Sequence, residues 1–278
     1  MTDARTYQIV MLGSFVVLGF LILGFEFSPL QVFLTIAAGL GTQVLAEILW
    51  AKKRWSEIEW RSALITTFSL CLLLRSNNPL WWIAGSSIAM LSKFALRWDG
   101  RHIYNPANFA LGACLLLSGG EVWIAAGQWG SLAVIAFIVL IAGGFVSHRA
   151  LRSDVSLYFL AFWSMALGYR MMVLHEPWPI QLNRLENGAL LLFTFFMISD
   201  PRTTPVARPA RILFAALVAG GAYYIQFKLF RTNGLIWSLL IFSTLVPVMN
   251  RIWRAEKFEW EKTAHRLWPL HRPQTQAS

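Results

Sequence analysis

The feature that most constrains this chain is a series of long apolar runs separated by short polar turns. Each run can cross the apolar part of a bilayer as a helix, because a helix satisfies its own backbone hydrogen bonds where lipid cannot. The sequence therefore predicts an all-α membrane protein with ten transmembrane helices. They are expected near residues 7–26, 29–49, 61–76, 79–97, 104–118, 128–147, 154–173, 185–199, 209–227 and 233–251.

The composition supports this interpretation and excludes other classes of protein. Hydrophobic residues make up 56% of the 278 positions and charged residues only 14%, which is typical of an integral membrane protein. The net charge of +10 would suit a nucleic-acid binder, but the basic residues lie in short loops between apolar runs, so no nucleic acid is expected as a partner. Phosphate-binding loops, nucleophile-elbow motifs and clustered Cys/His ligands are absent from the sequence, which leaves hydrolase, ATPase and metal-site interpretations without support.

The distribution of basic residues predicts how the chain is oriented. If ten helices cross the membrane, 18 of the 24 Lys and Arg residues fall on the side that holds the N-terminus and five on the other. Cytoplasmic loops carry the excess of Lys and Arg, so both termini are expected in the cytoplasm of a bacterial inner membrane. The turns at 98–104 and 200–208 are expected on the same side.

The ten runs divide into two sets of five, with a break near Gly119 and Gly120. In each set the third run is short and ends in a polar turn with proline. Because five is an odd number, a second set of five enters the membrane from the opposite face, which is the inverted-repeat architecture. We expect a first repeat over 1–120, a second repeat over 121–253 and an amphipathic or disordered cytoplasmic tail over 254–278.

Two segments bring polar side chains together with proline at the expected cytoplasmic level. Asn105 and Asn108 flank Pro106 at a helix start, and Asp200 precedes Pro201 at a helix end, with Thr203 beyond. Asn105 can be a simple N-cap, and the Asp-Pro segment a charged interfacial turn. As a set, the amides, carboxylate and hydroxyl suit the pyrimidine edge of a flavin, or a cation.

Lys93 is the basic residue that lies deep within a predicted span, four positions before Arg97. Ionisable groups inside a membrane are costly and are often functional. A lysine near a helix end can instead extend its ammonium group towards the interface. Both interpretations are kept at this point, and Lys93 and Arg97 join the candidate binding residues.

These segments resemble those of the RnfD/NqrB family of membrane subunits. The resemblance rests on Ser62–Leu70 with Lys93, on His102–Asn108, on Phe195–Pro205 and on Gly234–Arg251, and it covers roughly residues 60 to 251. Family members belong to the Na⁺-translocating NADH:quinone reductase and to the Rnf ferredoxin:NAD⁺ complex. The compact chain is similar to the shortened members labelled UnbU.

The resemblance implies ten helices in two repeats and a flavin cofactor. The family's non-covalent flavin, riboflavin or FMN, would be lined here by Asn105, Asn108 and Asp200. The family's second flavin is FMN attached to a threonine after the fifth span. The corresponding connection here, Leu117–Trp129, contains no threonine, so covalent FMN is not expected.

We therefore expect a membrane flavoprotein that takes part in transmembrane electron transport, as a subunit of a flavin-dependent oxidoreductase. Its expected partners are the lipid bilayer, other electron-transport subunits or redox proteins, and a quinone. Two alternatives stay open at the level of sequence: an inverted-repeat transporter, and a non-redox subunit that serves assembly. No residue is assigned a catalytic role.

Overall fold

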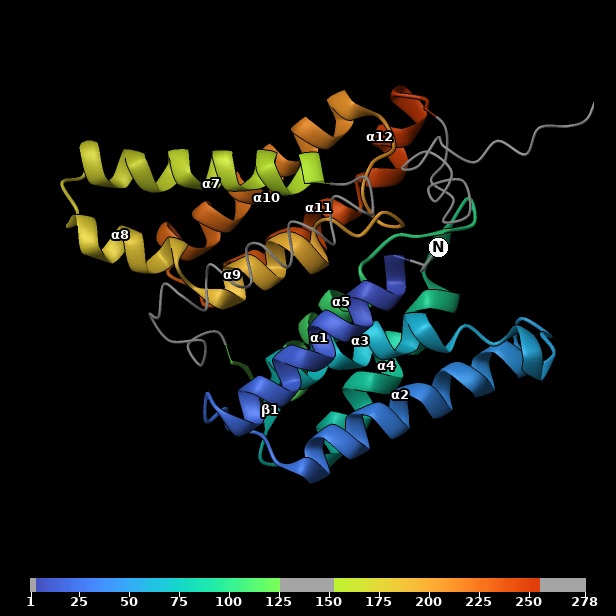
Figure 1. Cartoon of the computed structure of the whole chain (residues 1–278). Coiled ribbons are helices and arrows are strands. Elements are labelled where there is room, and N and C mark those ends of the chain that lie inside the picture. Colours follow the sequence, from blue (N-terminus) through green and yellow to red (C-terminus); the bar gives the residue numbers. More distant parts are fainter. Residues whose placement is uncertain (1–3, 126–152, 256–278) are drawn as a thin grey trace, which may run out of the picture.

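The computed structural model describes residues 4–125 and 153–255, which are mostly helical. Figure 1 shows two groups of helices, one from the blue-to-green first half and one from the yellow-to-red second half. The groups meet where α5 (Pro106–Leu117) packs against α11 (Gly234–Ser243). The expected run at 128–147 and the tail beyond Ala255 lie outside the described residues.

The helices follow the apolar runs closely in position. The first half contains α1 (Ala4–Leu21), α2 (Pro29–Leu49), the short 3₁₀ turn η1 (Trp55–Glu57), α3 (Trp60–Leu73), α4 (Pro79–Ala95) and α5. The second half contains α7 (Ser153–Met172), α8 (Trp178–Leu185), α9 (Gly188–Leu192), η3 (Phe193–Met197), α10 (Arg208–Phe227), α11 and α12 (Val246–Ile252). Helix α8 falls in a stretch for which the sequence pattern predicts no helix.

Local capping explains where several helices begin. Asn78 and Asn105 each precede a proline at the first helical position, and the side chain of each accepts a hydrogen bond from a backbone N–H of the first turn. Ser28 caps α2 in the same way, with Pro29 at its first position. Proline is favourable there because its missing N–H would have no helical partner. These starts are therefore fixed by a few neighbouring residues.

The described helices are shorter than ten full-length spans would require. By length and composition, α2 and α10 could each cross a membrane, and α11 with α12 could form a third span bent by 47°. Other apolar helices, among them α3 and the continuous α9–η3 segment, have 10–17 residues. The expectation of ten complete spans is thus not confirmed for the described part of the chain.

Two of the apolar runs are broken by polar or irregular structure. The run at 185–199 begins as α9, continues as one π-helical turn, η3, and stops before Pro201. The run at 61–76 stops at Leu73 and continues as strand β1 (Leu74–Ser76). π-helical turns often occur at functional sites, and here one leads directly into Asp200.

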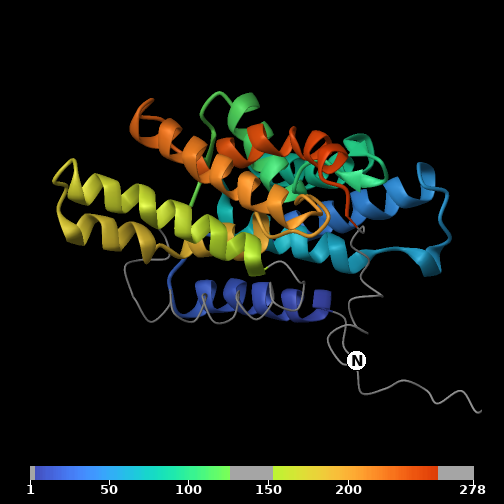
Figure 2. The same cartoon turned by 90° about the horizontal axis from the view of Figure 1, so that it is seen from above.

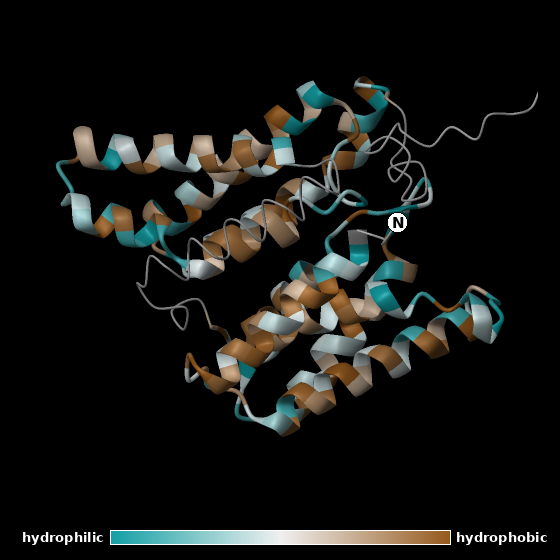
Figure 3. Cartoon of the chain, viewed as in Figure 1, coloured by the Kyte–Doolittle hydropathy of each residue, from teal (hydrophilic) through white to brown (hydrophobic). Residues whose placement is uncertain are grey.

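The same order of helix packing recurs in both halves. Helix α2 packs on α4 and α4 on α5, while α7 packs on α10 and α10 on α11. At Gly39, α2 lies so close to α3 that a Cβ atom would come within 2.2 Å of Cγ2 of Thr67. The absence of a side chain at Gly39 therefore permits this close packing. Figure 2 shows the helices running in roughly one direction, and Figure 3 shows apolar residues along most of them.

Two small antiparallel sheets, not expected from the sequence, join segments between helices. Strand β1 pairs with β4 (Val122–Ile124), and β2 (Arg97–Trp98) pairs with β3 (Arg101–His102). The β2–β3 turn is Asp99-Gly100, and both residues have positive φ angles, of 50° and 78°. Asp-Gly favours this tight hairpin turn because glycine and aspartate tolerate positive φ. The β2–β3 hairpin leads directly into the start of α5.

Candidate functional site

The candidate site forms where the start of α5 meets the turn that follows η3. The Asn105 side chain accepts a hydrogen bond from the N–H of Asn108 at 3.1 Å and so caps α5. Its amide nitrogen donates to a carboxylate oxygen of Asp200 at 3.4 Å and lies 3.5 Å from the Met197 carbonyl oxygen. Asn105 therefore caps its own helix and also joins two segments that are 95 positions apart in the sequence.

The turn at 200–204 is held together by the backbone of Asp200. Its carbonyl oxygen accepts hydrogen bonds from the N–H of Thr203 at 3.1 Å and of Thr204 at 3.0 Å. The Thr204 hydroxyl donates to the same oxygen at 2.9 Å, and the Asp200 carboxylate accepts from the N–H of Arg202 at 2.9 Å. The Thr203 hydroxyl also lies against the Asp200 carbonyl, at 3.4 Å, so it takes part in the turn and does not line the cavity described below.

Arg101 fastens this turn to the β2–β3 hairpin. One guanidinium nitrogen donates to the carbonyl oxygens of Pro201 at 2.9 Å and Thr204 at 2.7 Å. Hydrogen bonds from a charged donor are stronger than those between neutral groups. In the sequence Arg101 is one of many basic residues in loops, and no pattern there predicts its role in the site. The Asp99-Gly100 pair signals the hairpin but does not reveal which carbonyls Arg101 reaches.

These segments enclose a small polar cavity of about 70 Å³. Its wall includes Asn105 and Asp200 from the two halves, Lys93 from α4 and His102 from β3. The first two turns of α1 and α3 contribute Arg5, Gln8, Ser62 and Thr66, and Arg202 contributes from the 200–204 turn. The wall thus offers amide, carboxylate, hydroxyl and ammonium groups within one space.

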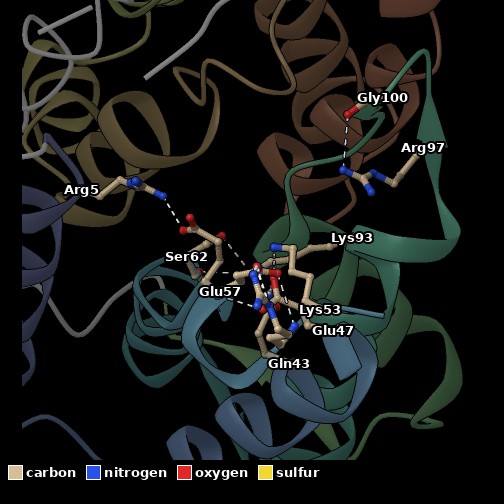
Figure 4. A network of polar contacts seen from close by, with 11 residues as sticks. Arg5, Gln43, Glu47, Lys53, Glu57, Ser62, Lys93, Arg97 and Gly100 are labelled. Carbon is tan, nitrogen blue, oxygen red and sulfur yellow. Dashed lines mark hydrogen bonds and ion pairs between the residues drawn. The ribbon is translucent and has the colours of Figure 1, made fainter. Parts of the chain in front are cut away.

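Lys93 is 4% exposed and reaches towards α3 (Figure 4). Its ammonium group donates to the carbonyl oxygen of Ser62 at 3.1 Å and lies 3.2 Å from the Ser62 hydroxyl. Within the described ranges it forms no ion pair. The Lys93 amino group is therefore buried in the cavity wall, where it bonds to neutral oxygens and not to a carboxylate.

A buried carboxylate, Glu47, organises the neighbouring ends of α2 and α3 (Figure 4). It accepts hydrogen bonds from Gln43 at 3.1 Å, from Lys53 at 3.0 Å and from the N–H of Glu59 at 2.8 Å. Because its oxygens are already bonded, Glu47 holds the segment that leads into α3. Ser62, which accepts the hydrogen bond from Lys93, lies in the first turn of α3, directly after that segment.

Besides Thr203, two further predicted binding residues lie away from the cavity wall. Asn108 is 0% exposed and donates to the Ile236 carbonyl oxygen at 3.2 Å, which ties α5 to α11. Arg97 lies in β2, after α4 has ended, and its guanidinium group approaches the Gly100 carbonyl oxygen at 3.4 Å. Since α4 stops at Ala95, Lys93 and Arg97 do not share a helix face.

Burial and neighbouring charges change the acidity of the groups outside the helices. Burial raises the pKa of Asp200, against the Arg202 N–H and the nearby charges of Arg202, Arg101 and Lys93, which all lower it. Burial also lowers the pKa of His102 to about 3, aided by the positive charges of Arg202, Lys93 and Arg97. His102 is therefore neutral in the folded protein at ordinary pH.

The His102 shift predicts a loss of stability in mild acid. Its pKa is about 3 when folded and 6.5 ordinarily, so below pH 6.5 the unfolded chain binds the proton first. The contribution of His102 is complete above pH 6.5 and is lost as the pH falls towards 3. Linkage gives a loss of about 2 kcal/mol between about pH 7 and about pH 5. The free energy of unfolding, determined in mixed detergent micelles at several pH values, measures this loss.

His102→Gln should remove most of this pH dependence, and the exposed His175→Gln should keep it. The raised pKa of Asp200 acts in the opposite direction, stabilising the fold at low pH and less as the pH rises. That contribution is common to all three proteins and cancels in the comparison. Equal slopes for the wild type and His102→Gln would contradict the prediction.

A larger cleft of about 620 Å³ adjoins the cavity and shares His102 and Arg202 with it. The cleft lies between the β2–β3 hairpin and α12. Trp98, Arg101, Val206, Val246, Pro247, Arg251 and Arg254 are among its lining residues. It was not predicted, because its walls come from segments about 150 positions apart.

The chemistry of the cavity wall fits the polar edge of a flavin, but its closed volume does not. Asn105 can donate and accept, Asp200 can accept, and Lys93 and Ser62 add donors. Sites for small ligands measure roughly 300 Å³ or more, whereas about 70 Å³ holds a few water molecules. Binding of a ring would thus require a wall residue such as Arg202, shared with the larger cleft, to move. Among the described residues, no three His, Cys, Asp or Glu side chains gather as metal ligands.

Comparison with known proteins yields consistent matches. The model of the NQR2, RnfD, RnfE family matches residues 115–259. Three curated relatives are each named as the D component of an ion-translocating oxidoreductase complex. The protein from Tolumonas auensis is 34% identical over 67 residues, covering 24% of this chain and 19% of its own.

The other two alignments are longer and weaker. The Cronobacter sakazakii protein is 26% identical over 152 residues, 54% of this chain and 41% of its own. The Stutzerimonas stutzeri protein is 22% identical over 204 residues, 70% of this chain and 58% of its own. This chain thus spans less than two thirds of the length of each of these relatives.

Proposed function

The chain belongs to the NQR2, RnfD, RnfE family, as its sequence motifs predict. From that premise we propose that it is a membrane electron-transfer subunit that binds the polar edge of a non-covalent flavin in the Asn105–Asp200 cavity when a wall residue such as Arg202 moves. Its relatives named above are components of ion-translocating oxidoreductase complexes by name. Other subunits of such a complex, and a quinone as electron acceptor, are the partners that we propose.

The contact between Asn105 and Asp200 carries the proposal. An amide and a carboxylate from opposite halves of the chain meet at 3.4 Å in the wall of one cavity. The carboxyl group is buried enough for its pKa to rise, so retaining its charge requires donors close by. A flavin's polar edge supplies an N–H donor and carbonyl acceptors, which would match Asp200, Asn105, Lys93 and Ser62.

The residues of this chain would bind and position the cofactor, which would itself supply the one- and two-electron chemistry when bound. Asn105 and Asp200 would orient the polar edge. Arg101 would keep Asp200 in place through the Pro201 and Thr204 carbonyls. Lys93 would place a positive charge beside the cofactor, which favours a reduced, more negative state.

We also propose that the helices form two inverted five-helix repeats over 1–120 and 121–253, multi-pass in a bacterial inner membrane. The recurring contacts of α2, α4 and α5 with those of α7, α10 and α11 support this arrangement. The short α3 and α9–η3 helices coincide with the third apolar run of each proposed repeat. The excess of Lys and Arg in the turns near the cavity favours its cytoplasmic placement.

The direct test is to purify the protein in detergent and record its absorption spectrum. We expect a flavin band that co-purifies with the protein and is released intact by denaturation, because Leu117–Trp129 offers no threonine for attachment. A fluorescent band retained on the polypeptide in a denaturing gel would contradict non-covalent binding. Folded protein without flavin, even after incubation with riboflavin or FMN, would contradict the proposed function and favour a transporter or assembly subunit.

A further inference from the structure

The cleft between the β2–β3 hairpin and α12 has the size and lining of a ligand site distinct from the small cavity. Its volume of about 620 Å³ lies within the range of roughly 300–1,000 Å³ typical of small-molecule sites. Trp98, Val246 and Pro247 give it apolar surface. A ligand that fills it would thus have an organic part as well as a polar group.

Four arginines give the cleft an excess of positive charge. Arg101 and Arg202 line the cleft, and Arg202 also lines the small cavity. Arg251 and Arg254 come from the end of α12 and the residues after it. Across residues 4–125 and 153–255, none of the four forms an ion pair. Asp99 also lines the cleft, so the arginines outnumber the carboxylates among the described lining residues.

Two buried polar atoms in the lining have no hydrogen-bond partner within the described structure. They are Nδ1 of His102, a residue 9% exposed, and Nη1 of Arg101. Buried polar atoms in folded proteins are nearly always bonded to protein, water or a ligand. Nη2 of Arg101 donates to the Pro201 and Thr204 carbonyls, whereas its Nη1 has no hydrogen-bond partner within the described structure.

One arginine of the cleft is held in place by an aromatic ring of the hairpin. The Arg251 guanidinium stacks over the Trp98 ring at 4.9 Å from its centre. Stacking restrains the planar guanidinium while leaving its N–H donors at the edge of the plane. A restrained guanidinium binds phosphate oxygens in pairs at a smaller cost in side-chain entropy.

From these observations we propose that the cleft binds the phosphate group of an organic phosphate. Arg251 and Arg254 contact the phosphate oxygens, and the surface of Trp98, Val246 and Pro247 packs on the organic part. The same chemistry is presented by a soluble phosphate monoester and by the headgroup of an anionic phospholipid. The proposal does not depend on a flavin in the neighbouring cavity.

The test compares wild-type protein with the double variant Arg251→Gln/Arg254→Gln in lipid nanodiscs. In phosphatidylcholine nanodiscs, glycerol phosphate is titrated at fixed ionic strength and the thermal midpoint is recorded. In a second arm the nanodiscs contain phosphatidylglycerol and no soluble phosphate. A ligand that binds the folded state raises the midpoint. We expect the double variant to lose about tenfold or more in affinity, since two charged donors are removed.

The two arms identify the source of the phosphate. A midpoint rise with glycerol phosphate that the double variant lacks assigns a soluble ester, and one confined to phosphatidylglycerol assigns a lipid. Arg54→Gln serves as the control, because Arg54 is exposed and pairs with Glu57 away from the cleft. A rise equal in all proteins, or none in either arm, overturns the proposal. Asp200→Ala should keep the response, which separates this site from the flavin cavity.

Discussion

Asp200→Ala is expected to lower flavin retention by about tenfold or more while the protein stays folded. The carboxylate is the acceptor in the cavity wall, and removing it leaves a buried ligand donor without a partner. Such a loss costs roughly 1–3 kcal/mol, and 1.4 kcal/mol corresponds to a factor of ten. The flavin-to-protein absorbance ratio after gel filtration measures retention, and a thermal midpoint checks the fold.

Two further variants sharpen this experiment. Asp200→Asn keeps an acceptor oxygen and the shape of the side chain, so it should retain more flavin than Asp200→Ala. Asp154→Ala is the matched control, because Asp154 pairs with Arg211 at 2.7 Å, between α7 and α10 and outside the cavity wall. Full flavin content in the folded Asp200→Ala variant would contradict the proposed site. Asn105→Ala combined with Asp200→Ala should lose less than the sum of the single changes, because the two residues share one ligand.

Arg75→Met is expected to destabilise the protein by roughly 1–3 kcal/mol. Arg75 is 2% exposed and donates to the carbonyl oxygens of Cys71 and Leu74, both at 2.8 Å, at the end of α3. It also lies over the Phe27 ring, 5.1 Å from its centre. The last carbonyls of a helix have no helical partner, so this side chain satisfies them. The Leu74 carbonyl keeps a hydrogen bond from the Gln31 side chain at 2.8 Å, so the Cys71 carbonyl is the one left without this partner. An unsatisfied buried carbonyl costs roughly 1–3 kcal/mol, and relief from burying a charge offsets part of that cost.

Unfolding in mixed detergent micelles of wild type and variant gives this difference in free energy. Arg75→Lys should recover less than half of the loss, because one ammonium group cannot reproduce the planar fork of donors. Arg54→Met is the control, since the Arg54 side chain is 85% exposed and its ion pair with Glu57 contributes little. An Arg75→Met protein as stable as Arg54→Met would show that the α3 carbonyls are satisfied in another way.

The positions of the helices could be predicted because they depend on neighbouring residues. Apolar periodicity and the Asn-Pro starts at Asn78 and Asn105 act within one helical turn, and the structure begins α4 and α5 at those prolines. Helix length was harder to predict. Nothing in the sequence indicates that the run ending near Ser76 leaves the helix at Leu73 to pair with β4, because the partner strand lies nearly 50 positions away.

The candidate site divides in the same way. The order of the predicted spans and the distribution of basic residues predict that Asn105 and Asp200 lie at one level, and in the structure they are in hydrogen-bond contact. The partner of Asn108 is different: its amide reaches Ile236 in α11, a choice set by how α5 and α11 pack. In the sequence Arg101 is one of many basic residues in loops. Its role depends on the fold, which places the Pro201 and Thr204 carbonyls beside it.

The sequence by itself thus determined the membrane class, the family, the helix starts and the residue types available to the site. The membrane class and the helix starts follow from composition, periodicity and capping, which are local, and the family follows from the resemblance of the motifs. Tertiary structure alone decided that Arg101 holds the Asp200 turn, that Lys93 rests on Ser62, and that a cleft opens between the hairpin and α12. These contacts join residues 31 to about 150 positions apart, and their geometry depends on how all the intervening helices pack.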